Sequence, residues 1–296
     1  MLSLAALAAL HATYAEEADL PITPAQIGDL VVGDHAPVIM GTLNLSRDST
    51  YRESVAVSTQ SAIRKARVQI AQGAGVVDIG AESSTARAAR VEADEQIARL
   101  VPVVTEIAVE TVVSVETYEP RVVEACLKSG ARVLNMTGRE HEEEMLSLAA
   151  EYDAAVVMCF GELANVREIG SVDLGADPIP ALVDHFGERL EHARRLGVDN
   201  VIIDPGMGFY YRDLTDPLTR ARHQTRVLAH AFRLRTLGVP VCNALPHAFD
   251  LFEDEFRKAE GFFAVLASLG GTHLFRTHEV AHVRAVLTSM AALDVG

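Results

Sequence analysis

Polar side chains suited to ligand recognition follow several short apolar runs of this chain. Glu116, Asn135 and Asp204 each stand at the end of one such run. An ionised carboxylate accepts two parallel N–H bonds from an amidine-like edge, and an asparagine amide both donates and accepts. If the three residues converge, they suit a flat heterocycle that carries such an edge. The alternative is local, because Asn135 and Asp204 are also residue types that cap the loops after strands.

A second set of side chains has the chemistry of anion binding. Arg276 and His278 end the last apolar run, and Asn44 ends the first. Arginine presents a fork of donors that suits phosphate oxygens, so these three residues are candidates for a phosphate or diphosphate site. The alternative is an ion pair at the surface between Arg276 or His278 and Glu279 or another nearby acid.

These residues need a scaffold that brings the ends of separate runs together. From Pro37 onward, β-rich runs alternate with stretches whose apolar residues recur at three- and four-residue spacing, the pattern of a parallel α/β fold. Eight runs are predicted to be strands: residues 38–43, 75–79, 111–115, 132–134, 154–159, 200–203, 239–243 and 273–276. Eight units favour a closed (β/α)8 TIM barrel over an open sheet, and no G-x-G-x-x-G motif follows the first run. In such a barrel, side chains at the carboxyl ends of the strands line the active site.

Helix signals divide the chain further. Residues 92–108 begin with acidic side chains, and residues 178–196 stop before Gly197, so both ranges are predicted to be helices. Residues 37–296 are predicted to form the barrel, and residues 1–36 an N-terminal extension packed on it or on a second subunit. Residues 2–10 are apolar but lack a basic leader and an A-x-A cleavage pattern, so we expect a helix there and no signal peptide.

Composition excludes several classes of protein. The 296 residues carry a net charge of −15, which argues against a nucleic-acid partner, and 49% of them are hydrophobic, enough for a large core. No apolar run approaches the roughly 18 residues of a membrane span. Cys126, Cys159 and Cys242 lie far apart in apolar surroundings, which predicts buried thiols and no disulfide framework or zinc site of cysteines. We therefore expect a soluble cytoplasmic protein.

Five motifs together make the chain resemble dihydropteroate synthase from Val38 to Ala291. They are residues 39–44 (IMGTLN), 78–83 (DIGAES), 115–120 (VETYEP), 204–209 (DPGMGF) and 276–280 (RTHEV). The resemblance implies a pterin-binding barrel that joins a 6-hydroxymethyl-dihydropterin diphosphate to an arylamine such as p-aminobenzoate. It also implies Mg²⁺, with Asn44 as a candidate ligand, and a homodimer.

The same resemblance assigns roles to individual residues. Glu116, Asn135 and Asp204 would contact the pterin, together with His247 after the seventh strand. Asn44, Arg276 and His278 would hold the diphosphate and act in catalysis. Contacts from loops are expected from a further set of residues, of which the first two could instead orient the neighbouring loop: Asp78, Glu82, Ser84 and Arg47.

The chain departs from the family pattern mainly on the acceptor side. Where the family has Ser-Arg-Lys after strand seven, this chain has residues 245–247 (LPH), which removes a lysine that His247 replaces only partly. Residues 84–86 (STA) stand where the family has Thr-Arg-Pro, which removes another cation. Glu116 replaces an aspartate, Arg47 a proline and Met136 an aspartate.

Three functions follow as alternatives. The first is a transferase that joins the pterin diphosphate to an amine that need not be p-aminobenzoate. The second is a folate-dependent one-carbon transferase, which shares the pterin pocket and needs no acceptor clamp. The third is a homologue that binds pterin without catalysis. Asn44, Arg276 and His278 favour the first, and the lost Ser-Arg-Lys triplet favours the second.

Overall fold

The eight predicted runs form one parallel sheet that closes into a barrel. The computed structural model describes residues 2–46, 55–56, 58–82, 90–161, 175–206 and 214–293. The barrel strands are β3 (Val38–Asn44), β4 (Val76–Gly80), β5 (Val112–Glu116), β6 (Val133–Met136), β7 (Ala155–Cys159), β8 (Val201–Asp204), β9 (Cys242–Ala244) and β10 (Leu274–Thr277). Their order is β8-β7-β6-β5-β4-β3-β10-β9, and a parallel bridge between Ile203 and Val241 joins the two ends. The predicted (β/α)8 barrel is confirmed.

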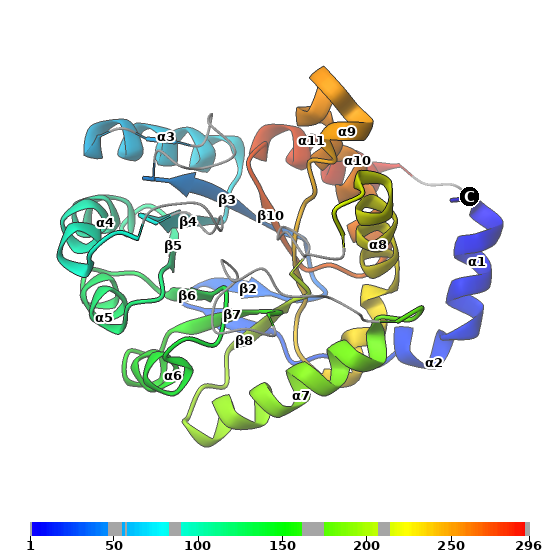
Figure 1. Ribbon diagram of the computed structural model, residues 1–296, viewed down its shortest axis with the longest axis horizontal. Coiled ribbons are helices and arrows are strands. Elements are labelled where there is room, and N and C mark those ends of the chain that lie inside the picture. The colour runs from blue at the N-terminus through cyan, green and yellow to red at the C-terminus, as the bar shows by residue number, and fades with distance from the viewer. Residues whose placement is uncertain are drawn as a thin grey trace.

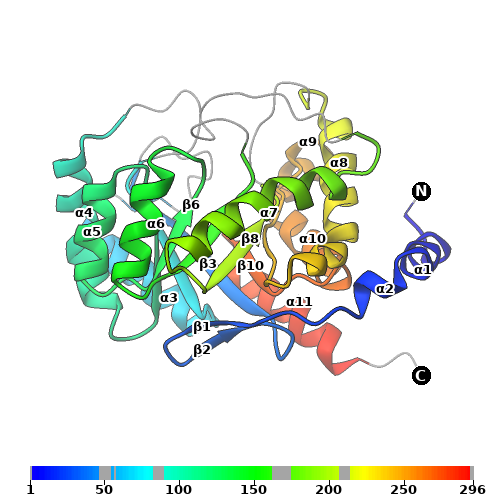
Figure 2. The same cartoon turned by 90° about the horizontal axis from the view of Figure 1, so that it is seen from below.

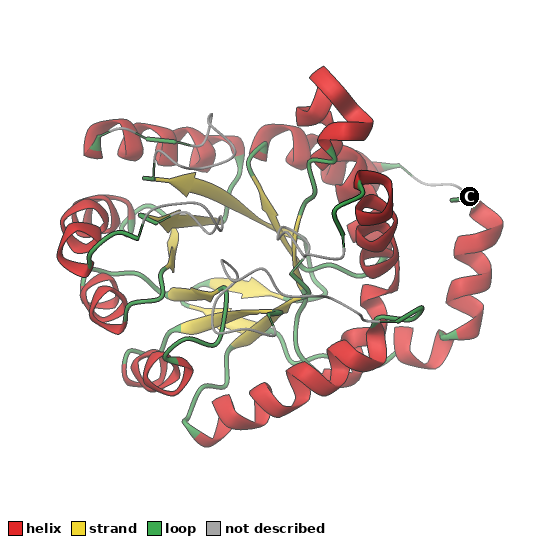
Figure 3. Cartoon of the chain, viewed as in Figure 1, coloured by secondary structure: helices red, strands yellow, loops and turns green. Residues whose placement is uncertain are grey.

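Helices surround the strands on the outside (Figures 1 and 3). The longer ones are α3 (Thr59–Gln72), α4 (Ala93–Ile107), α5 (Pro120–Lys128), α6 (Glu142–Glu151), α7 (Ile179–Arg195), α8 (Pro217–His230), α10 (Phe256–Leu269) and α11 (Val280–Ala292). Short helices lie between α8 and α10: η2 (Ala231–Leu237), α9 (Phe249–Phe252) and η3 (Glu253–Glu255). The two helices predicted over residues 92–108 and 178–196 are confirmed as α4 and α7. Among the described residues, none of the helices combines the length and apolar character that crossing a bilayer requires.

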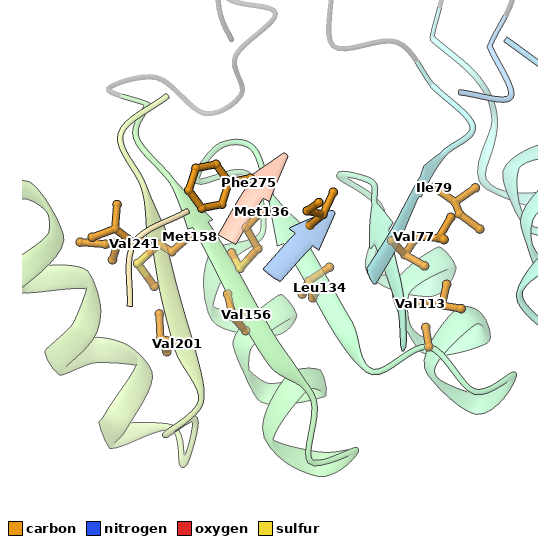
Figure 4. Packing of buried hydrophobic residues seen from close by; sticks show 14 of the residues in the cluster. Val77, Ile79, Val113, Leu134, Met136, Val156, Met158, Val201, Val241 and Phe275 are labelled. Atoms are coloured by element: carbon orange, nitrogen blue, oxygen red, sulfur yellow. The ribbon is translucent and has the colours of Figure 1, made fainter. Parts of the chain in front are cut away.

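Alternate residues of each strand face opposite sides, which divides the core in two. Val77, Val113, Leu134 and Val156 belong to the large cluster that the strands share with the helices (Figure 4). The strand residues that face the other way belong to a second cluster inside the barrel: Val38, Met40, Val76, Val133, Ala155, Val157, Cys159, Ile202, Cys242 and Leu274. The inner cluster fills the half of the barrel where the strands begin, so the positions that continue the same alternation towards the strand ends are left for polar residues.

The N-terminal segment covers the end of the barrel where the strands begin. Its hairpin of β1 (Ala25–Ile27) and β2 (Leu30–Val32) contributes Ala25, Ile27 and Val32 to the inner cluster (Figure 2). Before it lie α1 (Leu4–Thr13), the helix predicted from residues 2–10, and α2 (Ala15–Ala18). The Arg233 guanidinium of η2 lies 3.6 Å from the centre of the Tyr14 ring, which fastens these helices to the barrel. The hairpin acts as a plug at the end opposite the candidate site.

An ion pair ties this segment to the last strands. Asp34 accepts hydrogen bonds from Arg235 Nη1 and Nη2 at 2.8 and 2.9 Å and lies 3.1 Å from His273 Nε2. Arg235 lowers the pKa of Asp34 to about 2, although partial burial opposes the shift. Because this folded-state pKa is below the unfolded value, the pair stabilises the fold above about pH 4, and the contribution is lost as the pH falls towards 2.

We expect Asp34→Asn to lower the free energy of unfolding at pH 7 by at most about 1 kcal/mol, because the pair is partly solvated. The difference from wild type should shrink between pH 4 and pH 3 in urea unfolding. Asp184→Asn, at an exposed position on α7, is the matched control. A difference that stays constant down to pH 3 would show that the pair is not the cause.

Candidate active site

A layer of polar side chains continues the inner face of the barrel at the ends of the strands. Asp78 lies two residues after inward-facing Val76, Asn135 two after Val133, Asp204 two after Ile202, and Arg276 two after Leu274. Asp78, Asn135 and Asp204 are buried, and Arg276 is 9% exposed. Asn135 and Asp204, two of the three residues expected to converge, therefore share one face of the barrel with Asp78 and Arg276.

Asp78 orients Asn135. Asn135 Nδ2 donates to Asp78 Oδ2 at 2.9 Å, and Ser114 Oγ donates to Asp78 Oδ1 at 2.6 Å. These bonds turn the NH2 group of the Asn135 amide towards Asp78. The amide oxygen, Oδ1, lies 3.5 Å from the Cys159 thiol. These contacts of Asp78 are thus with Asn135 and Ser114 of strands β6 and β5, and not with the neighbouring loop that it was expected either to orient or to join in contacting a ligand.

Asp204 is a fully buried carboxylate with one oxygen held by the backbone. The N–H of Gly206, which has a φ of 79°, donates to Asp204 Oδ1 at 2.8 Å. Asp204 Oδ2 has no well-formed hydrogen bond among the described residues, and its neighbours are Arg276 and the thiols of Cys159 and Cys242. Burial raises the pKa of Asp204, although Arg276 opposes the shift. A buried acceptor of this kind is costly, which makes it suited to the N–H groups of a ligand.

Arg276 lies between two carboxylates. Its Nη2 is 3.7 Å from Asp204 Oδ2, and its Nη1 is 3.9 Å from Glu116 Oε2. Burial alone would lower the pKa of Arg276, but the carboxylates of Asp204 and Glu116 raise it above its usual value, so the guanidinium stays charged. Both separations are longer than a hydrogen bond, so these two contacts are ion pairs held by charge rather than by close N–H bonds.

Glu116 has neighbours of its own on the adjacent strand. Thr137 Oγ1 lies 3.3 Å from Glu116 Oε1 and 2.9 Å from the Tyr118 hydroxyl. Burial and the nearby Glu116 carboxylate raise the pKa of Tyr118, so its phenol stays protonated. Glu116 is thereby held at the rim of the layer, within reach of Arg276.

Arg189 of α7 supports the layer from behind. Its side chain is buried, and it donates from Nη1 to the Cys159 carbonyl at 2.7 Å and from Nη2 to the Gly138 carbonyl at 3.2 Å. Its Nε also donates to Glu142 at the start of α6. One guanidinium thus ties together the ends of β6 and β7 and the first turn of α6.

We expect Arg189→Met to lower the free energy of unfolding by about 3–5 kcal/mol, because the change leaves the largely buried Glu142 and two carbonyl groups without their donor. Urea unfolding at pH 7 measures the change. Arg195→Met, at an exposed position of the same helix, should change it by less than about 0.5 kcal/mol. A loss below about 1 kcal/mol for Arg189→Met would contradict this role.

A second polar cluster, which we call the His–Glu–His cluster, consists of His247, Glu260 and His278. Glu260 Oε1 lies 3.0 Å from His247 Nε2 and 3.1 Å from His278 Nδ1. Glu260 is fully buried on α10, and the two histidines keep the pKa of Glu260 well below its usual value in spite of burial. The contacts of His247 thus include His278 and Glu260, neither of which belongs to the polar layer around Asp204.

The remaining predicted residues lie at the edge of the layer or outside the described part. Asn44 ends β3 on the same face as Met40, and its carbonyl accepts from the Ala56 N–H at 2.8 Å. Glu82 Oε2 accepts from the Val91 N–H and from Gln96 Nε2, both at 3.2 Å, so Glu82 orients the chain before α4. Arg47 and Ser84 lie outside the described residues.

The residues around the site that sequence reasoning missed are Ser114, Thr137, Arg189 and Glu260. Ser114 and Thr137 each stand two residues from a predicted ligand contact, so period-two alternation could have found them. Glu260 is a lone acid in the apolar run of α10, a pattern that signals a buried carboxylate with a partner. Nothing in the sequence identifies that partner.

Comparison with known proteins agrees with the fold and identifies the family. The family model described as pterin binding enzyme matches residues 40–278. Dihydropteroate synthase of Streptococcus pyogenes serotype M3 is 31% identical over 221 residues, 73% of this chain and 77% of its own length, and that of Bacillus subtilis is 29% identical over 268 residues, 86% and 88%. The structure of dihydropteroate synthase from Thermus thermophilus in complex with 4-aminobenzoate has a TM-score of 0.73 at 25% identity, covering 92% of this chain and all of that one. The chain therefore belongs to the dihydropteroate synthase family of pterin-binding enzymes.

Proposed function

We propose that the chain is a transferase that joins a 6-hydroxymethyl-dihydropterin diphosphate to an amine, and that this amine need not be p-aminobenzoate. The observation that carries the proposal is the buried layer, in which Asp204 Oδ2 has no well-formed hydrogen bond among the described residues and Arg276 lies between two carboxylates. Asp204 suits the N–H edge of the pterin, and Asn135, oriented by Asp78, adds a donor and acceptor beside it. Glu116 and His247 are further candidates for pterin contact.

The proposed reaction needs little chemistry from the protein. The amine nitrogen attacks the pterin methylene carbon, the bond from that carbon to the diphosphate oxygen breaks, and the amine loses a proton to solvent. Arg276, His278 and Asn44 would stabilise the charge that collects on the departing diphosphate. The other residues bind and orient the pterin, which supplies much of the rate.

Asn44 is the candidate protein ligand for a Mg²⁺ ion in this reaction. Asn44 is a partly buried residue at the end of β3, on the same face as Met40. Its amide carries an oxygen of the kind that Mg²⁺ prefers, and Mg²⁺ usually keeps few protein ligands when a diphosphate is present. A bound Mg²⁺ would neutralise charge on the diphosphate. Asn44 would hold it together with the substrate.

The residues expected around the acceptor amine favour an acceptor that is not held by a positively charged side chain. His247 stands where the family has lysine, and its Nε2 lies 3.0 Å from the buried Glu260 carboxylate. The negative charge of Glu260 beside this imidazole opposes the approach of a second carboxylate. A p-aminobenzoate carboxylate would gain little from this pair, whereas charged hydrogen bonds usually contribute about 1.5–3 kcal/mol each.

Calorimetric titration tests the donor substrate. The purified protein is titrated with 6-hydroxymethyl-dihydropterin diphosphate, and separately with tetrahydrofolate and its methyl derivative, each with and without Mg²⁺. Preference for the diphosphate in the presence of Mg²⁺ supports the transferase. Preference for the reduced folates would favour a one-carbon transferase, the second candidate, which the lost Ser-Arg-Lys triplet supports.

Product formation tests the acceptor. Turnover is compared with p-aminobenzoate and with its neutral isostere p-aminobenzamide at equal concentrations. Similar kcat/KM values support an acceptor without a carboxylate anchor, and a strong preference for p-aminobenzoate would contradict it. Tight binding of pterin with no product from either amine would indicate the non-catalytic homologue.

A further inference from the structure

We propose that His247, Glu260 and His278 form a binding site for a divalent transition-metal ion, with Zn²⁺ as the expected occupant. The three side chains come from the segment after β9, from α10 and from the segment after β10, and their donor atoms all lie within 4.8 Å of one another. Two imidazoles and one carboxylate are a donor set that zinc and similar ions prefer. The three ligands do not include Asn44, the residue proposed for Mg²⁺.

The distances in the cluster fit a shared ion. Donor atoms bound to one zinc ion at about 2.0–2.2 Å lie roughly 2.8–3.6 Å from each other, for angles between 90° and the tetrahedral value. Glu260 Oε1 lies 3.0 Å from His247 Nε2 and 3.1 Å from His278 Nδ1. The two histidine nitrogens lie within 4.8 Å of each other, so rotation of the rings towards Glu260 Oε1 would bring all three atoms to bonding distance of one ion.

The carboxylate is oriented for this role by bonds to its other oxygen. Glu260 Oε2 accepts from the backbone N–H groups of His278 and Glu279, each at 3.1 Å, and from the Thr277 hydroxyl. Supporting bonds of this kind fix the direction of metal ligands. The result is that Oε1 is presented to the histidines while Oε2 holds the turn before α11.

Burial and packing complete the arrangement. An ionised carboxylate with no exposed surface is costly unless it is paired or coordinates a metal. The His247 ring stacks on Phe249 of α9, with ring centres 5.2 Å apart and planes 24° apart, which restricts its orientation. His247 and His278 follow the carboxyl ends of β9 and β10, the end of the strands where barrel enzymes of this type carry their chemistry, and α9 and α10 lie near β10 (Figure 1).

The charge of the cluster would change with the metal. Two neutral imidazoles and a carboxylate carry −1, and a divalent ion makes the total +1. Three protein ligands leave at least one position open for water or an anionic oxygen. The site would therefore supply, at the position where His247 replaces a lysine, the cation that the side chains alone lack. This last consequence rests on the proposed function, whereas metal binding itself does not.

The test is metal binding by the full-length protein after treatment with a chelator. Isothermal titration with Zn²⁺ should show one site per chain, and Co²⁺ bound at the same site should show visible d–d absorption that Zn²⁺ abolishes. Mg²⁺ should not displace Zn²⁺, because nitrogen donors favour zinc. No Zn²⁺ binding in wild type, or displacement by Mg²⁺, would overturn the proposal.

Variants assign the site. His247→Ala should weaken Zn²⁺ binding by more than about 100-fold, since even supporting partners of metal ligands commonly contribute 10- to 100-fold. Glu260→Gln should weaken Zn²⁺ binding to the same extent. His247→Ala disturbs the fold less, because His247 is partly exposed, whereas the buried Glu260 also holds the turn before α11. His35→Ala, at an exposed position, is the control and should bind as wild type does. Equal affinity of His247→Ala and wild type would overturn the proposal. Because no pterin is present, failure here leaves the donor-substrate test unaffected.

Discussion

Asp204→Asn is expected to weaken binding of the pterin diphosphate by about 100-fold or more. The substitution removes the charge of a buried acceptor and turns one of its two oxygens into an N–H donor that faces the N–H edge of the ligand. Charged hydrogen bonds contribute about 1.5–3 kcal/mol each, which corresponds to roughly 10- to 150-fold in Kd. Titration calorimetry of the folded variant measures the loss.

The control for this prediction is Asp199→Asn, an exposed position just before β8, which should bind as wild type does. Circular dichroism and urea unfolding of Asp204→Asn show whether the fold is kept, because Arg276 loses a charged neighbour in this variant. Unchanged affinity in a folded Asp204→Asn protein would mean that Asp204 does not contact the pterin, and the assignment of the buried layer to pterin binding would fail.

Arg276→Met is expected to weaken binding of the diphosphate by about 100-fold and to affect a reduced folate much less. The guanidinium can donate two charged hydrogen bonds to phosphate oxygens, and tetrahydrofolate offers no phosphate to receive them. The comparison of the two ligands in the same variant separates loss of a specific contact from a general disturbance of the site. Equal losses for both would contradict the phosphate role of Arg276.

The same substitution should also make stability more dependent on pH. Without the guanidinium, the pKa of Asp204, which burial already raises, should rise further. When the pKa of a carboxyl group is higher in the folded state than in the unfolded state, the folded protein is more stable while the group is protonated. This stability is lost as the pH rises through the folded-state pKa. Urea unfolding should therefore show Arg276→Met closest to wild type near pH 5 and furthest from it near pH 8.

Arg121→Met is the matched control for both measurements. Arg121 pairs with Asp94 at the surface, and both side chains are mostly exposed. Removing such a pair should change stability by less than about 1 kcal/mol and leave both affinities unchanged. A similar effect of Arg121→Met would point to net charge rather than to the position of Arg276.

The two polar clusters have different roles in the proposed reaction. The layer around Asp204 and Arg276 concerns which donor substrate binds, and the His–Glu–His cluster concerns what meets the acceptor or the departing anion. If Zn²⁺ binds and p-aminobenzoate is preferred only when it does, the metal replaces the missing lysine. If p-aminobenzamide reacts equally well with and without Zn²⁺, the acceptor is not held through a carboxylate.

Sequence alone was enough for the fold and for the placement of the main polar residues. All eight predicted strands form within one to three residues of their expected bounds, because buried strands of a parallel barrel are short continuous apolar runs that local composition reveals. Asn135, Asp204 and Arg276 could be placed at strand ends for the same reason. Period-two alternation, applied strictly, would also have placed Asp78 in the layer.

The tertiary structure decided which side chains meet. Glu260 is 13 residues after His247 and 18 before His278, and only the packing of α10 against the ends of β9 and β10 brings its carboxylate between the two rings. Likewise, the register of β4 against β5, and of β5 against β6, sets Asp78 beside Ser114 and Asn135. Local sequence determines the period and the ends of each element, whereas contacts between elements depend on sheet register and helix packing, which involve residues far apart in the chain.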